Sequence, residues 1–199
     1  MLEALTGAGL ATSAGLNAYI PLLAIGLLGR FTDLIDLPAG WNWLSNGWVI
    51  AILVVLLAIE VVADKVPVLD SANDIVQTIV RPTAGGLAFG AGASSETTTV
   101  TDPGSFFTSH QWVPVAVGIV LALGVHGIKA TARPVINATT VGVGAPIAST
   151  TEDIVSVVMS VVAILLPVVI LLFLLGLVAF FVWAVRRRGA RKRRAVTPY

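Results

Sequence analysis

Two polar stretches of this chain carry most of the side chains that could bind a ligand or move a proton. The first stretch, residues 60–82, lies between two apolar segments and holds six ionisable groups: Glu60, Asp64, Lys65, Asp70, Asp74 and Arg81. An ionisable side chain inside a membrane costs roughly 3 kcal/mol or more unless it is paired or hydrated. We therefore expect these groups to face the protein interior or a water-filled vestibule.

The second stretch, residues 126–155, has a similar character. It contributes His126, Lys129, Arg133, Asn137 and Asp153. Arginine presents a planar fork of donors that fits carboxylate and phosphate groups, and lysine adds a point charge. We predict that the two stretches together bind an anionic substrate. The predicted binding residues are Lys65, Arg81, Lys129 and Arg133 with Asn17 and Asn137.

The same groups also allow proton transfer or plain ion pairing. Histidine titrates near neutral pH, and a desolvated carboxyl group can hold a proton there as well. The candidate proton carriers are Glu60, Asp74, His126 and Asp153. The alternative is a set of ion pairs that only hold the helices together, such as Glu60 with Lys129 or Asp74 with Arg81.

The composition limits the class of protein. Hydrophobic residues make up 56% of the 199 positions and charged residues 12%, and the mean hydropathy is +0.93. Apolar runs such as residues 48–59 and 154–185 are too long for a globule of this size to bury. They are apolar all round and do not alternate as barrel strands do. We predict an all-α integral membrane protein.

The residue types give catalysis little support. The chain has two histidines and no cysteine. This excludes disulfides and thiolate metal sites, and it leaves few groups for metal-dependent or nucleophilic chemistry. No phosphate-binding glycine loop or dinucleotide fingerprint is present. We expect no enzyme activity, no metal and no cofactor.

Six segments are candidates to cross the membrane, at about 20 residues per crossing. They are 4–29, 48–64, 74–93, 112–130, 134–149 and 152–186. Those rich in glycine and proline are expected to be broken or re-entrant. The first contains Asn17 and Pro21, so it is either one kinked helix or a broken helix whose free backbone groups line a cavity. Asn17 and Asn137 either contact a ligand or tie such broken helices together.

The distribution of charge predicts the orientation. Seven of the twelve basic residues lie in 186–194, whereas 94–111 contains no lysine or arginine. The basic residues 186–194 are therefore expected in the cytoplasm, and residues 94–111 are expected outside. Six crossings then place both termini in the cytoplasm. We predict one polytopic domain, residues 1–186, in the bacterial inner (plasma) membrane, followed by a basic cytoplasmic tail, residues 187–199.

A short motif occurs twice in the chain. Residues 67–76 and 146–155 each place a proline seven residues before an aspartate that is followed by Ile-Val. With six crossings, the two copies fall in halves of three crossings each, 4–93 and 112–186, and have opposite orientations. The motif thus indicates a 3+3 inverted repeat, in which interrupted helices meet near the midplane to form a site.

Three blocks of the sequence resemble a known bacterial integral-membrane family. They read GLNAYIPLLAIGLLGR, ADKVPVLDSANDIVQTIVRPTAGG and HGIKATARPVINATTVGVGAPIASTTEDI, in this order. The family is domain of unknown function 4126, and the resemblance extends over roughly residues 5–175. It implies a small, multi-spanning inner-membrane protein, and it implies no particular activity.

We therefore expect a small membrane protein that binds or transports an anionic substrate, such as a phosphorylated lipid carrier, a lipid or a small carboxylate. The alternative is a non-catalytic accessory subunit of a cell-envelope or lipid-transport complex. Membrane lipids are expected partners, together with copies of the same chain or a larger membrane complex. Nucleic acid is not expected, because a basic tail alone does not provide a folded basic surface.

Overall fold

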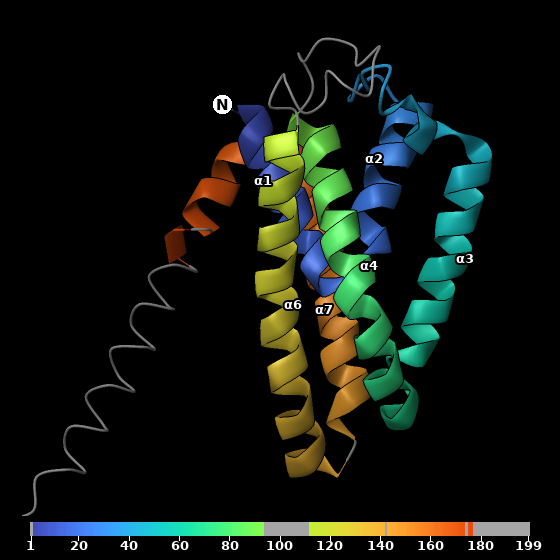
Figure 1. The fold of residues 1–199 in the computed structure, drawn as a ribbon, viewed down its shortest axis with the longest axis vertical. Helices are drawn as coiled ribbons and strands as arrows, with labels where there is room; N and C mark the ends of the chain where they lie inside the picture. The colour runs from blue at the N-terminus through green and yellow to red at the C-terminus, as the bar shows by residue number, and fades with distance from the viewer. Residues whose placement is uncertain (1, 94–111, 142, 174, 177–199) are drawn as a thin grey trace, which may run out of the picture.

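The computed structural model describes residues 2–93, 112–141, 143–173 and 175–176, and the regular secondary structure of this part is helical (Figure 1). The prediction of an all-α fold is thus confirmed. The helices are α1 (Leu2–Leu16), α2 (Tyr19–Phe31), the short 3₁₀ helix η1 (Asn42–Ser45), α3 (Gly47–Ala63), α4 (Pro67–Ala93), α6 (Trp112–Thr140) and α7 (Gly144–Leu165).

The first two helices form a V. In Figure 1, α1 descends from the upper end of the molecule and α2 returns to that end. Leu2, Leu34 and Gly92 line one pocket there, so both arms of the V open at the same end. The arms have 15 and 13 residues, or ~20 Å each at 1.5 Å per residue, which is less than the ~30 Å of a hydrocarbon core. Segment 4–29 is therefore the broken form and not one kinked helix.

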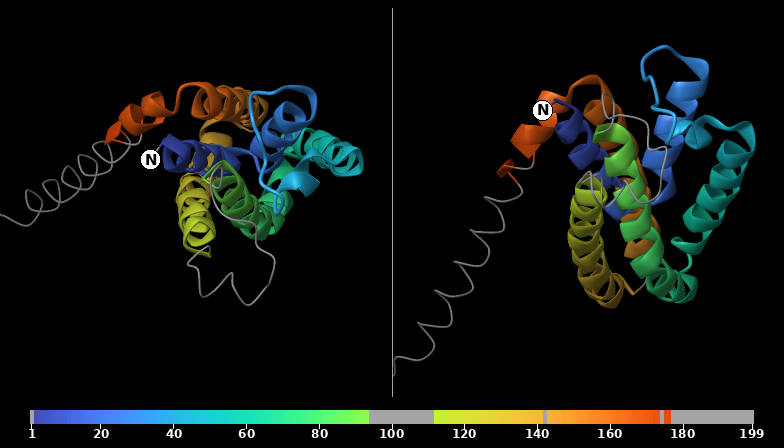
Figure 2. Two further views of the ribbon diagram at one scale, coloured as in Figure 1. Left: turned by 90° about the horizontal axis from the view of Figure 1, so that it is seen from above. Right: turned by 45° about the horizontal axis from the view of Figure 1, so that its top comes forward.

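The central helix of the bundle is α1, which lies between α4, α6 and α7 (Figure 2). Every residue from Gly7 to Gly15 is buried. Small side chains allow this close approach on all sides. A Cβ atom added to Gly7 would meet the Phe89 carbonyl oxygen at 2.9 Å, and one added to Gly15 would meet the Cβ atom of Val125 at 2.6 Å.

Hydroxyl groups and glycines also join the longer helices. Between α1 and α7, Ser13 Oγ lies 2.7 Å from Ser156 Oγ and 2.8 Å from Ser160 Oγ. Between α4 and α6, a Cβ atom on Gly118 would overlap the carbonyl oxygen of Gly85. These contacts fix the register of α7 against α1 and of α6 against α4. Helices α4, α6 and α7 carry most of the charged groups.

The predicted segments after residue 74 need correction. The proposed crossings 112–130 and 134–149 are not separate, because α6 continues through Pro134 and a short turn then leads into α7. Similarly, α4 continues through Pro82. Segment 152–186 is not one helix, because α7 ends at Leu165 and a second helical stretch begins at Pro167. A proline inside a long apolar helix thus marks a helix end only at the last of these three positions.

The inverted relation between the two proline–aspartate motifs is also wrong. One copy lies in α4 and the other in α7. Helix α6 runs antiparallel to α4, since Thr78 contacts His126 while Gly85 lies farther up, against Gly118. The turn at the lower end then makes α7 antiparallel to α6. Both copies therefore begin at the lower end, in helices that run in the same direction (Figure 1).

The V also changes the placement of the N-terminal end. Gly7 of α1 is packed against Gly92 of α4, so Leu2 lies at the same end as Ala93 and Trp112, the residues that flank segment 94–111 (Figure 1). The prediction placed these two parts of the chain on opposite sides of a membrane. That pair of assignments is wrong, because it assumed that residues 4–29 cross once. The predicted cytoplasmic tail, 187–199, lies outside the described residues.

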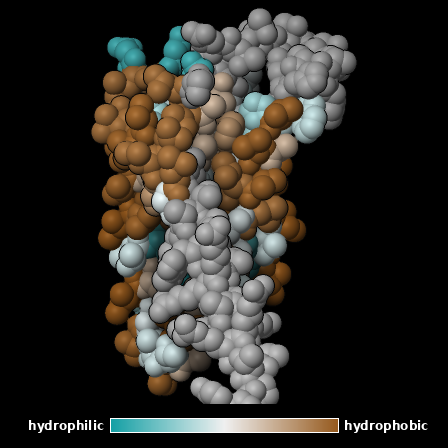
Figure 3. Space-filling model, turned by 90° about the vertical axis from the view of Figure 1, so that its left-hand side faces the viewer, coloured by the Kyte–Doolittle hydropathy of each residue, from teal (hydrophilic) through white to brown (hydrophobic). Residues whose placement is uncertain are grey.

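The outer surface is strongly apolar. Large aliphatic side chains are exposed along α3, including Ile52 and Ile59, and along the outer faces of α6 and α7. The face drawn in Figure 3 is mostly apolar over its coloured atoms. Within the described part of the chain, α6 and α7 are long and apolar enough to cross a membrane, and α2 and α3 are shorter apolar helices.

Candidate functional site

The interior contains a chain of ion pairs, which we call the buried ion-pair network. It joins six side chains in alternating charge: Glu60, Arg81, Asp64, Lys129, Glu152 and Arg133. They come from α3 and its C-terminal cap, α4, α6 and α7. The tip of the α1–α2 V meets the network at its centre. The three positive and three negative charges compensate one another, which is the condition for burying them in an apolar protein.

Arg81 lies at one end of the network and is fully buried. Its Nη2 donates to Glu60 Oε1 at 2.9 Å and lies 3.8 Å from Asp64 Oδ2. Its Nη1 is 3.0 Å from His126 Nδ1. A guanidinium can only donate, so Nδ1 accepts and the imidazole is neutral, with its proton on Nε2. That proton is donated to Thr78 Oγ1 at 3.1 Å.

Lys129 lies in the middle of the network, and all three of its N–H donors have partners. The ammonium group is 2.9 Å from Asp64 Oδ2, 3.1 Å from Glu152 Oε2 and 3.3 Å from the carbonyl oxygen of Leu16. Leu16 is the last residue of α1, so its carbonyl has no partner within the helix. Lys129 therefore links the ion pairs to the break between α1 and α2.

Arg133 and Glu152 form the other end. The Arg133 guanidinium holds the Glu152 carboxylate from two sides, with Nη2 to Oε2 at 2.5 Å and Nε to Oε1 at 3.4 Å. Lys129 contacts the same Oε2. Arg133 also donates to the carbonyl oxygen of Asp64 at 3.4 Å. The Glu152 side chain is 19% exposed, whereas the side chains of both cations are 2% exposed. Two cations thus surround one carboxylate that reaches toward solvent.

The break in the V is organised by Asn17. Its Oδ1 accepts from the backbone N–H groups of Tyr19 and Ile20 at 3.1 and 3.3 Å, which caps the start of α2. Its Nδ2 donates to Asp153 Oδ1 at 2.9 Å. The structural role predicted as an alternative for Asn17 is therefore present, and Asp153 is held next to the network by this bond.

Several buried polar atoms have no hydrogen-bond partner among the described residues. Two lie beyond the Arg133–Glu152 pair toward the lower end: Asn137 Oδ1, one turn along α6 from Arg133, and Ser149 Oγ, one turn before Glu152 on α7. Four more belong to the Arg81 end: Glu60 Oε2, Asp74 Oδ1, Arg81 Nε and Gln77 Oε1. Such atoms cost free energy in an apolar interior, so each marks a place where a further polar group would be stabilised.

The structure brings together most of the predicted site residues, and of the two ion pairs named in the sequence analysis it contains Asp74 with Arg81 but not Glu60 with Lys129. Glu60 pairs with Arg81 rather than Lys129. Asp74, 3.9 Å from Arg81, lies at the edge of the network. The Lys65 ammonium donates to the carbonyl oxygen of Val61 at 3.1 Å.

Asp64 and Glu152, which connect the cations, were missing from the predicted site. A signal for both was present, because three buried cations require three buried anions in an apolar protein. Asp64 follows Glu60 by one helical turn, and Glu152 precedes Asp153 directly. Asn73 was missed too; its side-chain amide donates to Asp64 Oδ1 at 2.8 Å.

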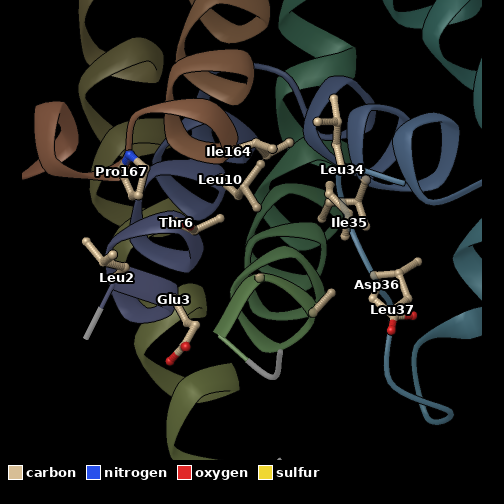
Figure 4. A pocket seen from close by; sticks show the side chains of 13 residues that line it. Leu2, Glu3, Thr6, Leu10, Leu34, Ile35, Asp36, Leu37, Ile164 and Pro167 are labelled. Atoms are coloured by element: carbon tan, nitrogen blue, oxygen red, sulfur yellow. The ribbon is translucent and has the colours of Figure 1, made fainter. Parts of the chain in front are cut away.

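A separate pocket of about 270 Å³ lies at the upper end, away from the ion pairs (Figure 4). Apolar side chains such as Leu10 and Ile164 line most of it, and Glu3 and Asp36 add two carboxylates. None of the network residues lines this pocket. Within the described residues, no group of three or more histidines, cysteines and carboxylates could hold a metal ion.

Comparison with known proteins identifies a family. No curated protein and no solved structure matches the chain. The family model described as "Domain of unknown function (DUF4126)" matches residues 4–187, which include both arms of the V and every residue of the ion-pair network. The chain therefore belongs to the DUF4126 family.

Proposed function

We propose that this chain is a membrane protein that binds and carries a small anion, with a carboxylate or phosphate group, at Lys129 and Arg133. The single observation that carries the proposal is the position of Glu152. Its carboxylate lies in the fork of Arg133 and within 3.1 Å of Lys129, which is the geometry that a substrate carboxylate or phosphate would adopt. Glu152 then acts as an internal anion that the substrate displaces.

The surroundings of Glu152 support exchange with an external anion. It is the most exposed member of the network, at 19%, so it can leave for water at the lower end. Asn137 Oδ1 and Ser149 Oγ lie one turn farther toward that end on the facing helices, both without a described partner. These two groups would accept from and donate to a hydroxylated or protonated anion on its way to Arg133. Lys65, Arg81 and Asn17 then support the site rather than contact the anion.

The membrane location of this proposal rests on the apolar outer surface and on α6 and α7. Tryptophans gather at the upper end, where Trp48 and Trp112 begin α3 and α6 and Trp41 packs on Gly90. This is typical of a membrane–water interface. A re-entrant V whose tip meets buried charges is the arrangement that transporters use at the membrane midplane. The proposed location is the bacterial inner membrane.

The test is anion binding by purified protein in lipid nanodiscs, measured by isothermal titration calorimetry. The probes are inorganic sulfate, a tetrahedral anion that does not titrate near neutral pH, and acetate. Glu152→Gln removes the competing charge and keeps the side-chain shape, so we expect at least tenfold tighter binding of one probe than in the wild type. Arg133→Lys keeps the charge but loses the fork, so we expect binding to weaken.

Asp74→Asn is the matched control, because this carboxylate is similarly exposed, at 17%, but lies outside the Lys129–Arg133 fork. Both substitutions remove one negative charge. An equal gain in affinity for Glu152→Gln and Asp74→Asn would show that only the net charge matters, and it would contradict the proposal. So would a folded Glu152→Gln protein that binds neither probe better than the wild type does.

The second candidate function is an accessory subunit of a membrane complex. The observation in its favour is that every cation of the network already has a carboxylate partner, as in a purely structural cluster. Native mass spectrometry of the protein extracted from its own membrane separates the two candidates. A stoichiometric protein partner without a small anion would favour the accessory subunit.

A further inference from the structure

The Arg81 end of the network contains a second group of polar atoms that the proposed anion site does not use. Glu60 lies on α3 and is 2% exposed. Its Oε1 accepts from Arg81, whereas its Oε2 has no donor among the described residues. On α4, Gln77 precedes Arg81 by one turn, so both face the same side of the helix. Gln77 is also 2% exposed, and its Oε1 likewise has no described donor.

Two buried acceptor oxygens without donors are an unstable arrangement, because each loses its hydrogen bonds to water and gains none in return. A proton on Glu60 Oε2 turns this atom from an acceptor into a donor. Gln77 Oε1, one turn from Arg81 on α4, is a buried acceptor to which such a donor could bond. Tyr19, whose hydroxyl interacts with Gln77, closes this group from the α2 side.

We infer that Glu60 is a proton-binding site, and that its proton is linked to the anion site through the alternating charges of the network. The proton is transferred from a hydronium ion of the solvent: one O–H bond of hydronium breaks, an O–H bond forms at Glu60 Oε2, and a water molecule is released. Glu60 then no longer offers a charge to Arg81.

Arg81 has other carboxylates within reach. Its Nη2 is 3.8 Å from Asp64 Oδ2, and its Nη1 is 3.9 Å from Asp74 Oδ1. Asp64 Oδ2 is also the atom that Lys129 holds at 2.9 Å. Once Arg81 shares Asp64 more fully, Lys129 loses part of that partner. It can then bind an external anion more strongly beside Arg133.

Charged and titratable groups from several helices surround Glu60. They are Tyr19 from α2, Arg81 and Gln77 from α4, Lys129 from α6 and Asp64 at the end of α3 itself. His126 lies on the other side of Arg81 and accepts from it through Nδ1. Among these groups, Glu60 is the carboxylic acid with an oxygen that has no donor in the described part of the chain.

The first measurement is infrared difference spectroscopy of the protein in nanodiscs across a pH series. A protonated carboxyl group gives its own C=O stretching band, and we expect Glu60→Gln to remove one such band. His126→Gln is the matched control, since its amide oxygen can still accept from Arg81, and it should keep the band. If no carboxyl band depends on Glu60 between pH 5 and 8, the proton site is disproved, whatever the protein binds.

Glu60→Gln leaves Arg81 without its nearest charge, so this variant can fail to accumulate. Gln77→Leu leaves the ion pair intact and removes the acceptor for the proton. It should therefore move the appearance of the band to lower pH. A band that stays at the wild-type pH in Gln77→Leu would contradict the proposed role of Gln77 as the acceptor for the Glu60 proton.

The link to the anion site rests on the proposed function, and it has a separate readout. Linkage is reciprocal, so a proton that favours the anion is itself favoured by the anion. In the wild type, sulfate affinity should rise as pH falls, by up to tenfold per unit for one proton. The slope should vanish in Glu60→Gln and persist in His126→Gln. Sulfate binding with no slope disproves the link and leaves the anion site standing. No sulfate binding at any pH disproves the anion site, while the infrared band still decides the proton site.

Discussion

Asp64 is the residue shared by all three cations of the network. Its Oδ2 lies 2.9 Å from Lys129, 3.6 Å from Arg133 and 3.8 Å from Arg81, and its Oδ1 accepts from Asn73. Removing one partner of a buried ion pair leaves an uncompensated charge, which costs about 3–5 kcal/mol. A residue with three such partners is therefore the point at which the folded state is most sensitive to the loss of one charge.

We expect Asp64→Asn to lower the free energy of unfolding by about 3–5 kcal/mol, because three buried cations then share two carboxylates. Thermal unfolding in detergent micelles, followed by circular dichroism, measures this effect. Asp74→Asn is the control: its carboxylate lies 3.9 Å from Arg81 and is partly exposed, so its loss should have a much smaller effect. Equal melting temperatures for the two variants would show that the network does not hold the helices together.

At the scale of the helices, close packing depends on particular glycines. Gly118 of α6 lies against the backbone of Gly85 in α4, and an added Cβ atom would overlap its carbonyl oxygen. Gly124, on the same helix, has nothing within 4 Å of an added Cβ atom among the described residues. The two positions therefore separate packing from helix propensity.

Gly118→Ala should destabilise the protein, because α4 and α6 must move apart to accept the methyl group. Gly124→Ala should be neutral or slightly stabilising, since alanine favours a helix by up to about 1 kcal/mol over glycine. The measurement is the melting temperature of each variant in the same detergent. If both substitutions shift it in the same direction, the tight α4–α6 contact is not a determinant of stability.

Hydropathy detects apolar helices, but it does not distinguish a helix that crosses a membrane from one that turns back. Apolar composition identified the helical class, but an arm of the V such as α2 is as apolar as a full crossing. Asn17 marked the break correctly, because its side chain caps the new helix start. Pro134 suggested a helix boundary that does not exist, because a proline can lie inside a long helix whose neighbours support it.

The ionisable residues were predictable as a group, but of their pairings only that of Asp74 with Arg81 was predicted correctly. Arg81, Lys129 and Arg133 were predicted as one site because buried charges in an apolar chain must gather. Their pairing depends on helix register, which the sequence expresses only through glycines such as Gly85 and Gly118. The turn between α6 and α7 brings Glu152 to Arg133. This turn was not predicted, because residues 134–149 were assigned as a separate crossing.

At the scale of the whole molecule, the V decides which parts of the chain lie at the same end of the bundle, and so which would share a side of the proposed membrane. With one crossing at residues 4–29, Leu2 and Phe31 would lie on opposite sides. With two arms that turn back at Asn17, they lie on the same side, together with Trp112 (Figure 1). Segment 94–111, which joins α4 to α6 at this end, contains no lysine or arginine. For the membrane protein proposed above, the positive-inside rule predicts that the upper end lies outside.

This orientation can be tested directly, because the chain has no cysteine of its own. Single cysteines at Leu2 and Phe31, which are 55% and 71% exposed, should react with a membrane-impermeant maleimide added to spheroplasts. A cysteine at Val143, 71% exposed at the lower end, should react only after the membrane is permeabilised. Labelling of Leu2→Cys and Phe31→Cys from opposite sides would exclude the V. Labelling of all three from one side would exclude a membrane-spanning bundle, and the buried charges would then have to be reinterpreted as the core of a peripheral protein.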